Sequence, residues 1–103
     1  MMNAEYFKDQ ICDELRGAKD YAKRAIEIKA MAPSWSSVLI KMSATEHDHA
    51  TNLFKMFKEY YSKISDVFSV EVPEYLKEID EEINKTYEKY SMKIKYLHEV
   101  YNK

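Results

Sequence analysis

MAPS, at residues 31–34, separates two long stretches with helical sequence patterns, and this break decides the fold. Proline disfavours a helical conformation at the residue before it, and Ser34 can cap the helix that follows. We therefore predict one helix over residues 3–30, with Asn3 as its N-cap, and a second over residues 34–62. Each has about 27 residues and is roughly 40 Å long. Because a connection this short makes neighbouring helices antiparallel, the pattern predicts a helical hairpin.

The composition of the whole chain favours long helices. Only one glycine and two prolines occur among the 103 residues, and all-β folds need many more turn residues. Pro73 fits the first position of a third helix over residues 73–101, which leaves residues 65–72 as a short linker packed on the bundle. The apolar residues of this helix recur at a spacing of three and four: Leu76, Ile79, Ile83, Tyr87, Tyr90, Ile94, Leu97 and Tyr101. We predict a single all-α domain spanning residues 1–103.

Charge and cysteine content argue against several functional classes. The formal net charge is −2, with lysines scattered among acids, so we expect no nucleic-acid binding. The longest aliphatic run is Val38–Ile40, so we expect no membrane span. The single cysteine, Cys12, cannot form an intrachain disulfide, and residues 1–10 show no apolar signal segment, so a cytoplasmic location is expected. A domain this small has a limited core, which favours association with a copy of itself.

Polar residues interrupt the apolar stripes of the first two helices. The stripe of the first helix contains Phe7, Ile11, Ala18, Tyr21, Ala25 and Ile28, with Glu14 in the gap. The stripe of the second helix contains Trp35, Val38, Met42, Leu53, Met56 and Tyr60, with Glu46 and His49 in the gap. In an antiparallel hairpin that turns near residues 31–32, position 14 lies opposite positions 48–50. The pattern therefore predicts that three ligand-type side chains meet at one level.

A metal ion would explain why these side chains point inward. Burying lone carboxylates is very costly without partners. Two carboxylates and an imidazole suit iron or manganese, and zinc also accepts them. Two other interpretations stay open: Glu14 can be solvated or paired with a lysine, and Glu46 and His49 can form a hydrogen-bonded pair without metal. His47 and Asp48 are rotated about 100° and 200° from Glu46 and are expected at the surface.

The same residues carry a family resemblance. The motif Glu14-Leu15-x-x-Ala18-x-x-Tyr21, followed by Glu46-x-x-His49-Ala50, resembles the ferritin-like superfamily, in particular bacterioferritins and rubrerythrins. The resemblance covers residues 4–62. It implies a di-iron carboxylate site in which Glu14 and Glu46 are carboxylate ligands, Glu46 bridges the metals and His49 is an imidazole ligand. Tyr21 resembles the tyrosine found near such sites and is the candidate for a catalytic role.

The third helix departs from this family pattern. Complete ferritin-like bundles supply a second Glu and a second Glu-x-x-His from later helices, whereas here His98 is preceded by Lys95 at the corresponding position. A homodimer, or a higher even oligomer, would supply the missing ligands and complete a four-helix core. Encapsulated ferritins are similar in having one half-site per short chain.

The resemblance implies an activity as well as a ligand set. We expect two iron ions per dimer and a ferroxidase-type oxidoreductase that oxidises Fe(II) with oxygen or peroxide. The alternative, from a different functional class, is a helical interaction or structural protein with a metal-free Glu/His network.

Overall fold

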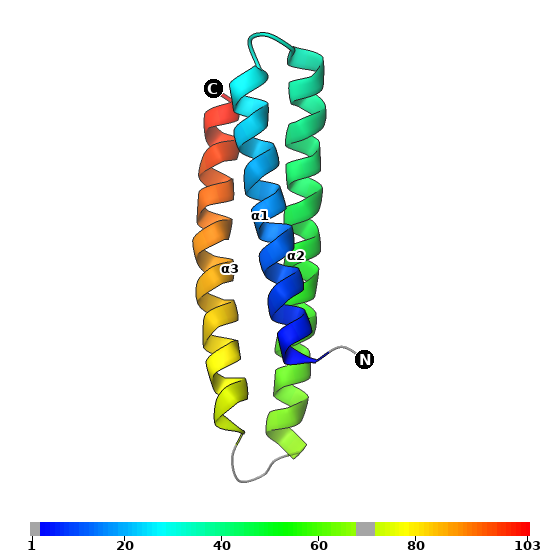
Figure 1. The fold of residues 1–103 in the computed structure, drawn as a ribbon, viewed down its shortest axis with the longest axis vertical. Coiled ribbons are helices and arrows are strands. Elements are labelled where there is room, and N and C mark those ends of the chain that lie inside the picture. Colours follow the sequence, from blue (N-terminus) through cyan, green and yellow to red (C-terminus); the bar gives the residue numbers. More distant parts are fainter. Residues whose placement is uncertain (1–2, 68–71) are drawn as a thin grey trace.

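Three long helices make up the chain in the computed structural model, which describes residues 3–67 and 72–103. They are α1 (Ala4–Ile28), α2 (Pro33–Val67) and α3 (Glu74–Tyr101). Figure 1 shows them side by side in alternating directions, with the end of α3 next to the connection between α1 and α2. The shape is elongated, 58 × 23 × 15 Å. The prediction of an all-α fold is thus confirmed for the described part of the chain.

The helix boundaries agree with the predicted ones at some positions and differ at others. The side chain of Asn3 accepts a hydrogen bond from the backbone N–H of Tyr6 at 2.9 Å, so its prediction as N-cap is confirmed. α2 begins at Pro33, whose fixed φ suits the first helical position, so the prediction that Ser34 caps this helix was wrong. Pro73 is the N-cap of α3 rather than its first residue.

α2 is also longer than predicted. It continues to Val67, so residues 65–67 belong to this helix and not to a linker. The reason is tertiary packing, because Ile64 lies against the hydrophobic core and keeps the last turns of α2 in place. Val72 packs on the same core, as expected of the linker, while residues 68–71 of the predicted linker lie outside the described residues.

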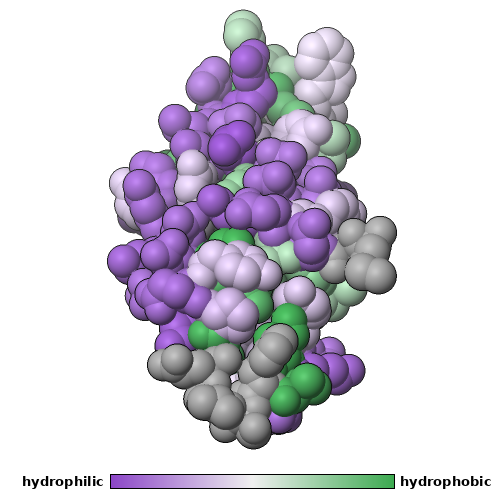
Figure 2. All heavy atoms as spheres, turned by 60° about the horizontal axis from the view of Figure 1, so that its bottom comes forward, coloured by the Kyte–Doolittle hydropathy of each residue, from purple (hydrophilic) through white to green (hydrophobic). Residues whose placement is uncertain are grey.

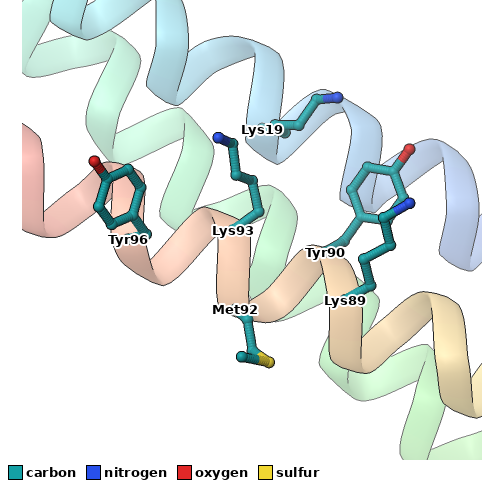
Figure 3. Close-up of a pocket in the computed structure, with 6 residues that line it drawn as sticks. All are labelled: Lys19, Lys89, Tyr90, Met92, Lys93 and Tyr96. Atoms are coloured by element: carbon teal, nitrogen blue, oxygen red, sulfur yellow. The ribbon is translucent and has the colours of Figure 1, made fainter.

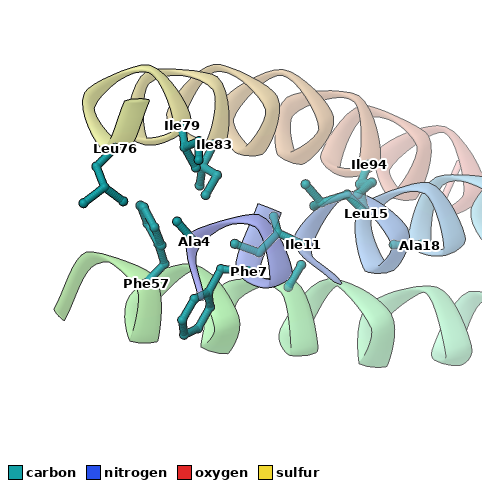
Figure 4. Packing of buried hydrophobic residues seen from close by; sticks show 11 residues of the cluster. Ala4, Phe7, Ile11, Leu15, Ala18, Phe57, Leu76, Ile79, Ile83 and Ile94 are labelled. Carbon is teal, nitrogen blue, oxygen red and sulfur yellow. The ribbon is translucent and has the colours of Figure 1, made fainter. Parts of the chain in front are cut away.

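The hydrophobic core lies where α1 meets the other two helices. Figure 4 shows how its apolar side chains from the three helices interdigitate. Its largest fully buried apolar side chains are Ile11, Leu15, Phe57, Ile83 and Ile94. Full burial of each such side chain is worth about 1.5–3 kcal/mol, so this cluster supplies much of the stability of the bundle.

Small residues bring α2 close to α1. The buried residues of α2 recur at every seventh position, namely Ser36, Ser43, Ala50 and Phe57. The hydroxyl groups of Ser36 and Ser43 donate hydrogen bonds of 2.6 Å to the carbonyl oxygens of Ala25 and Ala18 in α1. Because these hydroxyl groups find acceptors in the neighbouring backbone, their burial carries little desolvation cost.

A series of polar contacts joins α2 to α3. These contacts, from one end to the other, are Ser43–His98, His47–Ser91, Thr51–Tyr87 and Lys58–Asp80. Since the Ser43 hydroxyl donates to Ala18, the His98 ring must donate its Nε2–H to Ser43. Burial lowers the pKa of His98, and the nearby His47 lowers it further, so this ring is neutral near pH 7.

The predicted apolar stripes coincide only partly with the buried faces. On α1 the buried row runs through Leu15 and Ala22, which leaves Glu14 and Tyr21 half-buried at its edge. On α2 the buried row is displaced by about 100° from the predicted stripe, and Trp35 is 73% exposed. We call the uncovered side of the hairpin the open face. It consists of Glu14, Tyr21, Ile28, Trp35, Val38, Met42, Glu46, His49 and Met56, with Leu53 and Tyr60, which also pack on the hydrophobic core, at its edge.

The open face points away from α3. On α2 the polar residues that contact α3, such as His47 and Lys58, lie about 140–160° around the helix from the Met42 stripe. Elsewhere on the surface, Figure 2 shows apolar side chains at the end where α2 finishes and α3 begins, and mainly hydrophilic ones beyond them. No described helix combines the length and apolar character that crossing a membrane requires.

Candidate metal centre

Glu14, Glu46 and His49 come together between α1 and α2. One oxygen or nitrogen atom from each of the three side chains lies within 4.8 Å of the other two. The closest approach between an acid and the imidazole joins Glu14 Oε2 to His49 Nδ1 at 3.5 Å. Because the hairpin is antiparallel, residue 14 sits level with residue 49, and the three-residue spacing puts Glu46 on the same side of α2. The predicted convergence of these three residues is therefore present.

Burial differs among the three side chains. The Glu14 side chain is 23% exposed, whereas the His49 side chain is 54% exposed. Glu14 Oε2 is itself buried and has no hydrogen-bond partner among the described residues. Leaving a buried polar atom without a partner costs about 1–3 kcal/mol, and more when it is charged. A cation at this position would remove that cost, so the residues present fit a metal ion.

The carboxyl group of Glu14 also perturbs that of Glu46. The pKa of Glu46 is raised, first because the carboxyl group of Glu14 can share a proton with it, and then because of burial and the charge of Glu14. The nearby His49 opposes this shift. Adjacent carboxylates cannot both ionise cheaply unless a proton or a cation lies between them. The pair therefore favours capture of a positive charge.

Gly17 lies beside the carboxylate of Glu46, a position that the sequence analysis did not single out. A Cβ atom at position 17 would lie 3.4 Å from Glu46 Oε2. Gly17 is the only glycine of the chain and lies within α1, where glycine costs about 0.5–1 kcal/mol relative to alanine. The sequence did contain an indication of this position, because the single glycine of the chain lies within a predicted helix, one turn after Glu14.

The other candidate residues lie outside the group. Tyr21 is half-buried on the open face, two turns along α1 from Glu14, and does not belong to the set of converging ligand atoms. His47 turns towards α3, where its Nε2 lies 2.9 Å from Ser91 Oγ. Asp48 is exposed, as expected. Within residues 3–67 and 72–103, α3 contributes no ligand to a group of this kind.

The donor set and the position of the centre define what it can hold. Two carboxylates and one imidazole suit Fe, Mn or Zn, and they leave coordination positions for further ligands. The His49 side chain is more than half exposed, so this group of side chains is accessible from the open face. Comparisons with protein-family models, with curated proteins and with solved structures found no match to this chain. The chemistry of these side chains is therefore the basis for any functional assignment.

Proposed function

We propose that the chain is a non-haem di-iron protein of the ferroxidase type, with Glu14, Glu46 and His49 as its metal ligands. The observation that carries the proposal is the convergence of these three side chains around a buried carboxylate oxygen that has no hydrogen-bond partner among the described residues. Iron is favoured over a purely structural ion because an oxygen-rich site with open positions suits a metal that must react. Manganese and zinc also fit the donor set.

A homodimer would complete the site. The apolar residues of α2 on the open face are arranged almost symmetrically about the Glu46–His49 pair: Met42 and Leu53, then Val38 and Met56, then Trp35 and Tyr60. A twofold axis at this level would bring each residue of such a pair against the other residue in a second copy. Self-complementarity of this kind is what an isologous interface requires. Two copies would together supply four carboxylates and two imidazoles.

Each side chain then has a defined role. Iron bound at the site supplies one-electron chemistry between Fe(II) and Fe(III) towards oxygen or peroxide. Glu14 and Glu46 offset the positive charge, and Glu46 is the proposed bridging ligand. His49 provides a neutral nitrogen donor, and the apolar residues of the open face exclude water once a second copy covers them. Tyr21 stays a candidate for a catalytic role on this face.

The test is the metal content of the intact chain. Protein loaded anaerobically with Fe(II) and freed of excess iron should contain one iron per chain by elemental mass spectrometry. Glu46→Gln and His49→Ala should each lower this value at least about tenfold, because each removes one charge-assisted or nitrogen ligand. Glu59→Gln, which changes an exposed glutamate of the same helix, should leave it unchanged. Oxidation of the bound Fe(II) in air, followed by absorbance, then tests the activity.

The alternative is a metal-free network in an interaction protein, and the contact between His49 and Glu14 is its supporting observation. The two functions predict opposite effects on the apo-protein. If the centre exists for metal, Glu46→Gln relieves carboxylate repulsion and leaves the melting temperature of the apo-protein unchanged or higher. If it is a structural network, the same change lowers the melting temperature. Wild-type metal content in both Glu46→Gln and His49→Ala would refute the di-iron proposal.

A further inference from the structure

A second candidate site lies between α1 and α3, away from the open face. It is a hollow of ≈ 470 Å³ lined by Lys19, Lys89, Tyr90, Met92, Lys93 and Tyr96. Figure 3 shows Tyr90 and Tyr96 at its two ends, Lys93 between them on α3, and Lys19 opposite on α1. None of these residues belongs to the metal centre, so the hollow needs an explanation of its own.

The walls of this hollow carry positive charge only. Three of the lining residues are lysines, and none is an acid. The ion pairs among the described residues involve other side chains, so the ammonium groups of Lys19, Lys89 and Lys93 have no carboxylate partner there. In a chain with a net charge of −2, such a local excess of ammonium groups favours an anionic ligand.

Aromatic rings flank these ammonium groups. Lys19 Nζ lies 5.3 Å from the centre of the Tyr90 ring, and Lys93 Nζ lies 5.6 Å from the centre of the Tyr96 ring. Contacts of this kind with partly exposed lysines are weak, and they hold the amines at the hollow without neutralising them. The Tyr96 ring, which is 57% exposed, also offers a flat face on which a planar group can stack, whereas the Tyr90 ring packs against the hydrophobic core.

We propose that this hollow binds a nucleoside triphosphate or a closely related ring-bearing polyphosphate. The phosphate chain would lie among Lys19, Lys89 and Lys93, which act as point-charge donors to its oxygens. The base would stack on the exposed ring of Tyr96 at the end of the hollow. The proposal is independent of the metal centre and does not require iron.

The test is calorimetric titration of the metal-free full-length chain with ATP, with inorganic tripolyphosphate and with adenosine. ATP should bind saturably and more tightly than tripolyphosphate, adenosine should not bind measurably, and added salt should weaken the binding. Lys19→Gln and Lys93→Gln should each weaken ATP binding about tenfold, the loss expected for one charge-assisted hydrogen bond. Tyr96→Leu should weaken ATP binding and leave tripolyphosphate binding unchanged.

Lys55→Gln is the matched control, because it removes one charge from an exposed position on α2, outside the hollow. It should leave ATP binding as in the wild type, and circular dichroism should show the same helicity in all variants. The proposal is overturned if ATP does not bind saturably, if Lys55→Gln weakens binding as much as Lys93→Gln does, or if tripolyphosphate binds as tightly as ATP.

Discussion

At the residue scale, Glu14 is both a candidate metal ligand and a group whose burial lowers the stability of the fold. Its Oε2 atom is buried without a hydrogen-bond partner and lies 3.5 Å from His49 Nδ1. A sequence selected for stability alone would replace such a carboxylate by an apolar residue of similar size. Its neighbour Gly17 imposes a second cost by lowering helix propensity close to Glu46. Both features that lower stability, the buried carboxylate and the helical glycine, therefore lie at the same place, as is common at functional sites.

Gly17 gives a direct test of this interpretation. Gly17→Ala should raise the free energy of unfolding by about 0.4–1 kcal/mol, because position 17 is helical and an added methyl group would make an ordinary contact of 3.4 Å with Glu46. Gly17→Leu needs more room and should displace the Glu46 carboxylate, so that iron binding falls while the helices persist. Urea unfolding and metal content measure the two effects. Equal iron binding in both variants would contradict a spacing role for Gly17.

At the scale of the element, α2 has two faces that its sequence does not distinguish. The row Ser36, Ser43, Ala50 and Phe57 packs on α1, and the stripe from Trp35 to Tyr60 lies on the open face. The buried row consists mainly of small residues, which a search for large apolar side chains passes over. Its serines nevertheless determine how close the two helices come, because their hydroxyl groups bond to the α1 backbone.

Ser43 is the residue of α2 that joins all three helices, and its removal should be costly. Its hydroxyl donates to Ala18 in α1 and accepts from His98 in α3. Ser43→Ala should therefore lower the free energy of unfolding by about 1–3 kcal/mol, since the His98 N–H loses its partner. Urea denaturation followed by circular dichroism measures this change. Ser62→Ala, at an exposed position of the same helix, should stay within about 0.5 kcal/mol of wild type, and equal effects would refute the role of Ser43.

For the whole molecule, the main feature is the unequal coverage of the hairpin. α3 covers one side of α1 and α2, while the open face exposes tryptophan, methionine and valine beside Glu46 and His49. Exposed large apolar side chains grouped in this way are typical of surfaces that bind another protein. Its near-symmetry about Glu46 and His49 makes a second copy of the chain the proposed occupant.

The dimer proposal predicts a specific pattern of disruption and rescue. Val38→Lys should convert the dimer into a folded monomer, because Val38 is already 56% exposed in the single chain but would be buried in the dimer. Combining Val38→Lys with Met56→Glu should restore association, since the twofold axis would bring these two exposed positions together as ion pairs. Met92→Lys, at a position 67% exposed on α3, is the control and should remain dimeric.

Sedimentation equilibrium measures these association states, and the single tryptophan, Trp35, gives an independent signal. Its fluorescence should shift to the blue on dimerisation, because the open face would then exclude water. A wild-type chain that stays monomeric at all concentrations, with Trp35 emission typical of water, would exclude the shared site. The metal content of such a monomer would then decide whether three ligands suffice.

The sequence alone determined the helical state, the hairpin and the level at which Glu14, Glu46 and His49 meet. These features depend on local physics: the 3.6-residue period, the break at Pro33, the N-cap at Asn3 and the rise of 1.5 Å per residue. Errors of one or two residues in the predicted helix ends did not change the predicted level of the site. A shift of one or two residues at Ser34 or Pro73 leaves the two facing turns of α1 and α2 at the same height.

Only the tertiary structure decided which face of each helix is buried. α2 carries two apolar rows about 100° apart, and hydrophobic periodicity cannot tell which of them a neighbour within the same chain will cover. The packing of α3 determined which side of α2 is covered. α3 docks through His98, Ser91 and Tyr87, and these contacts join residues far apart in sequence. The same packing extended α2 to Val67 and left Glu46 and His49 on the face of α2 that α3 does not cover.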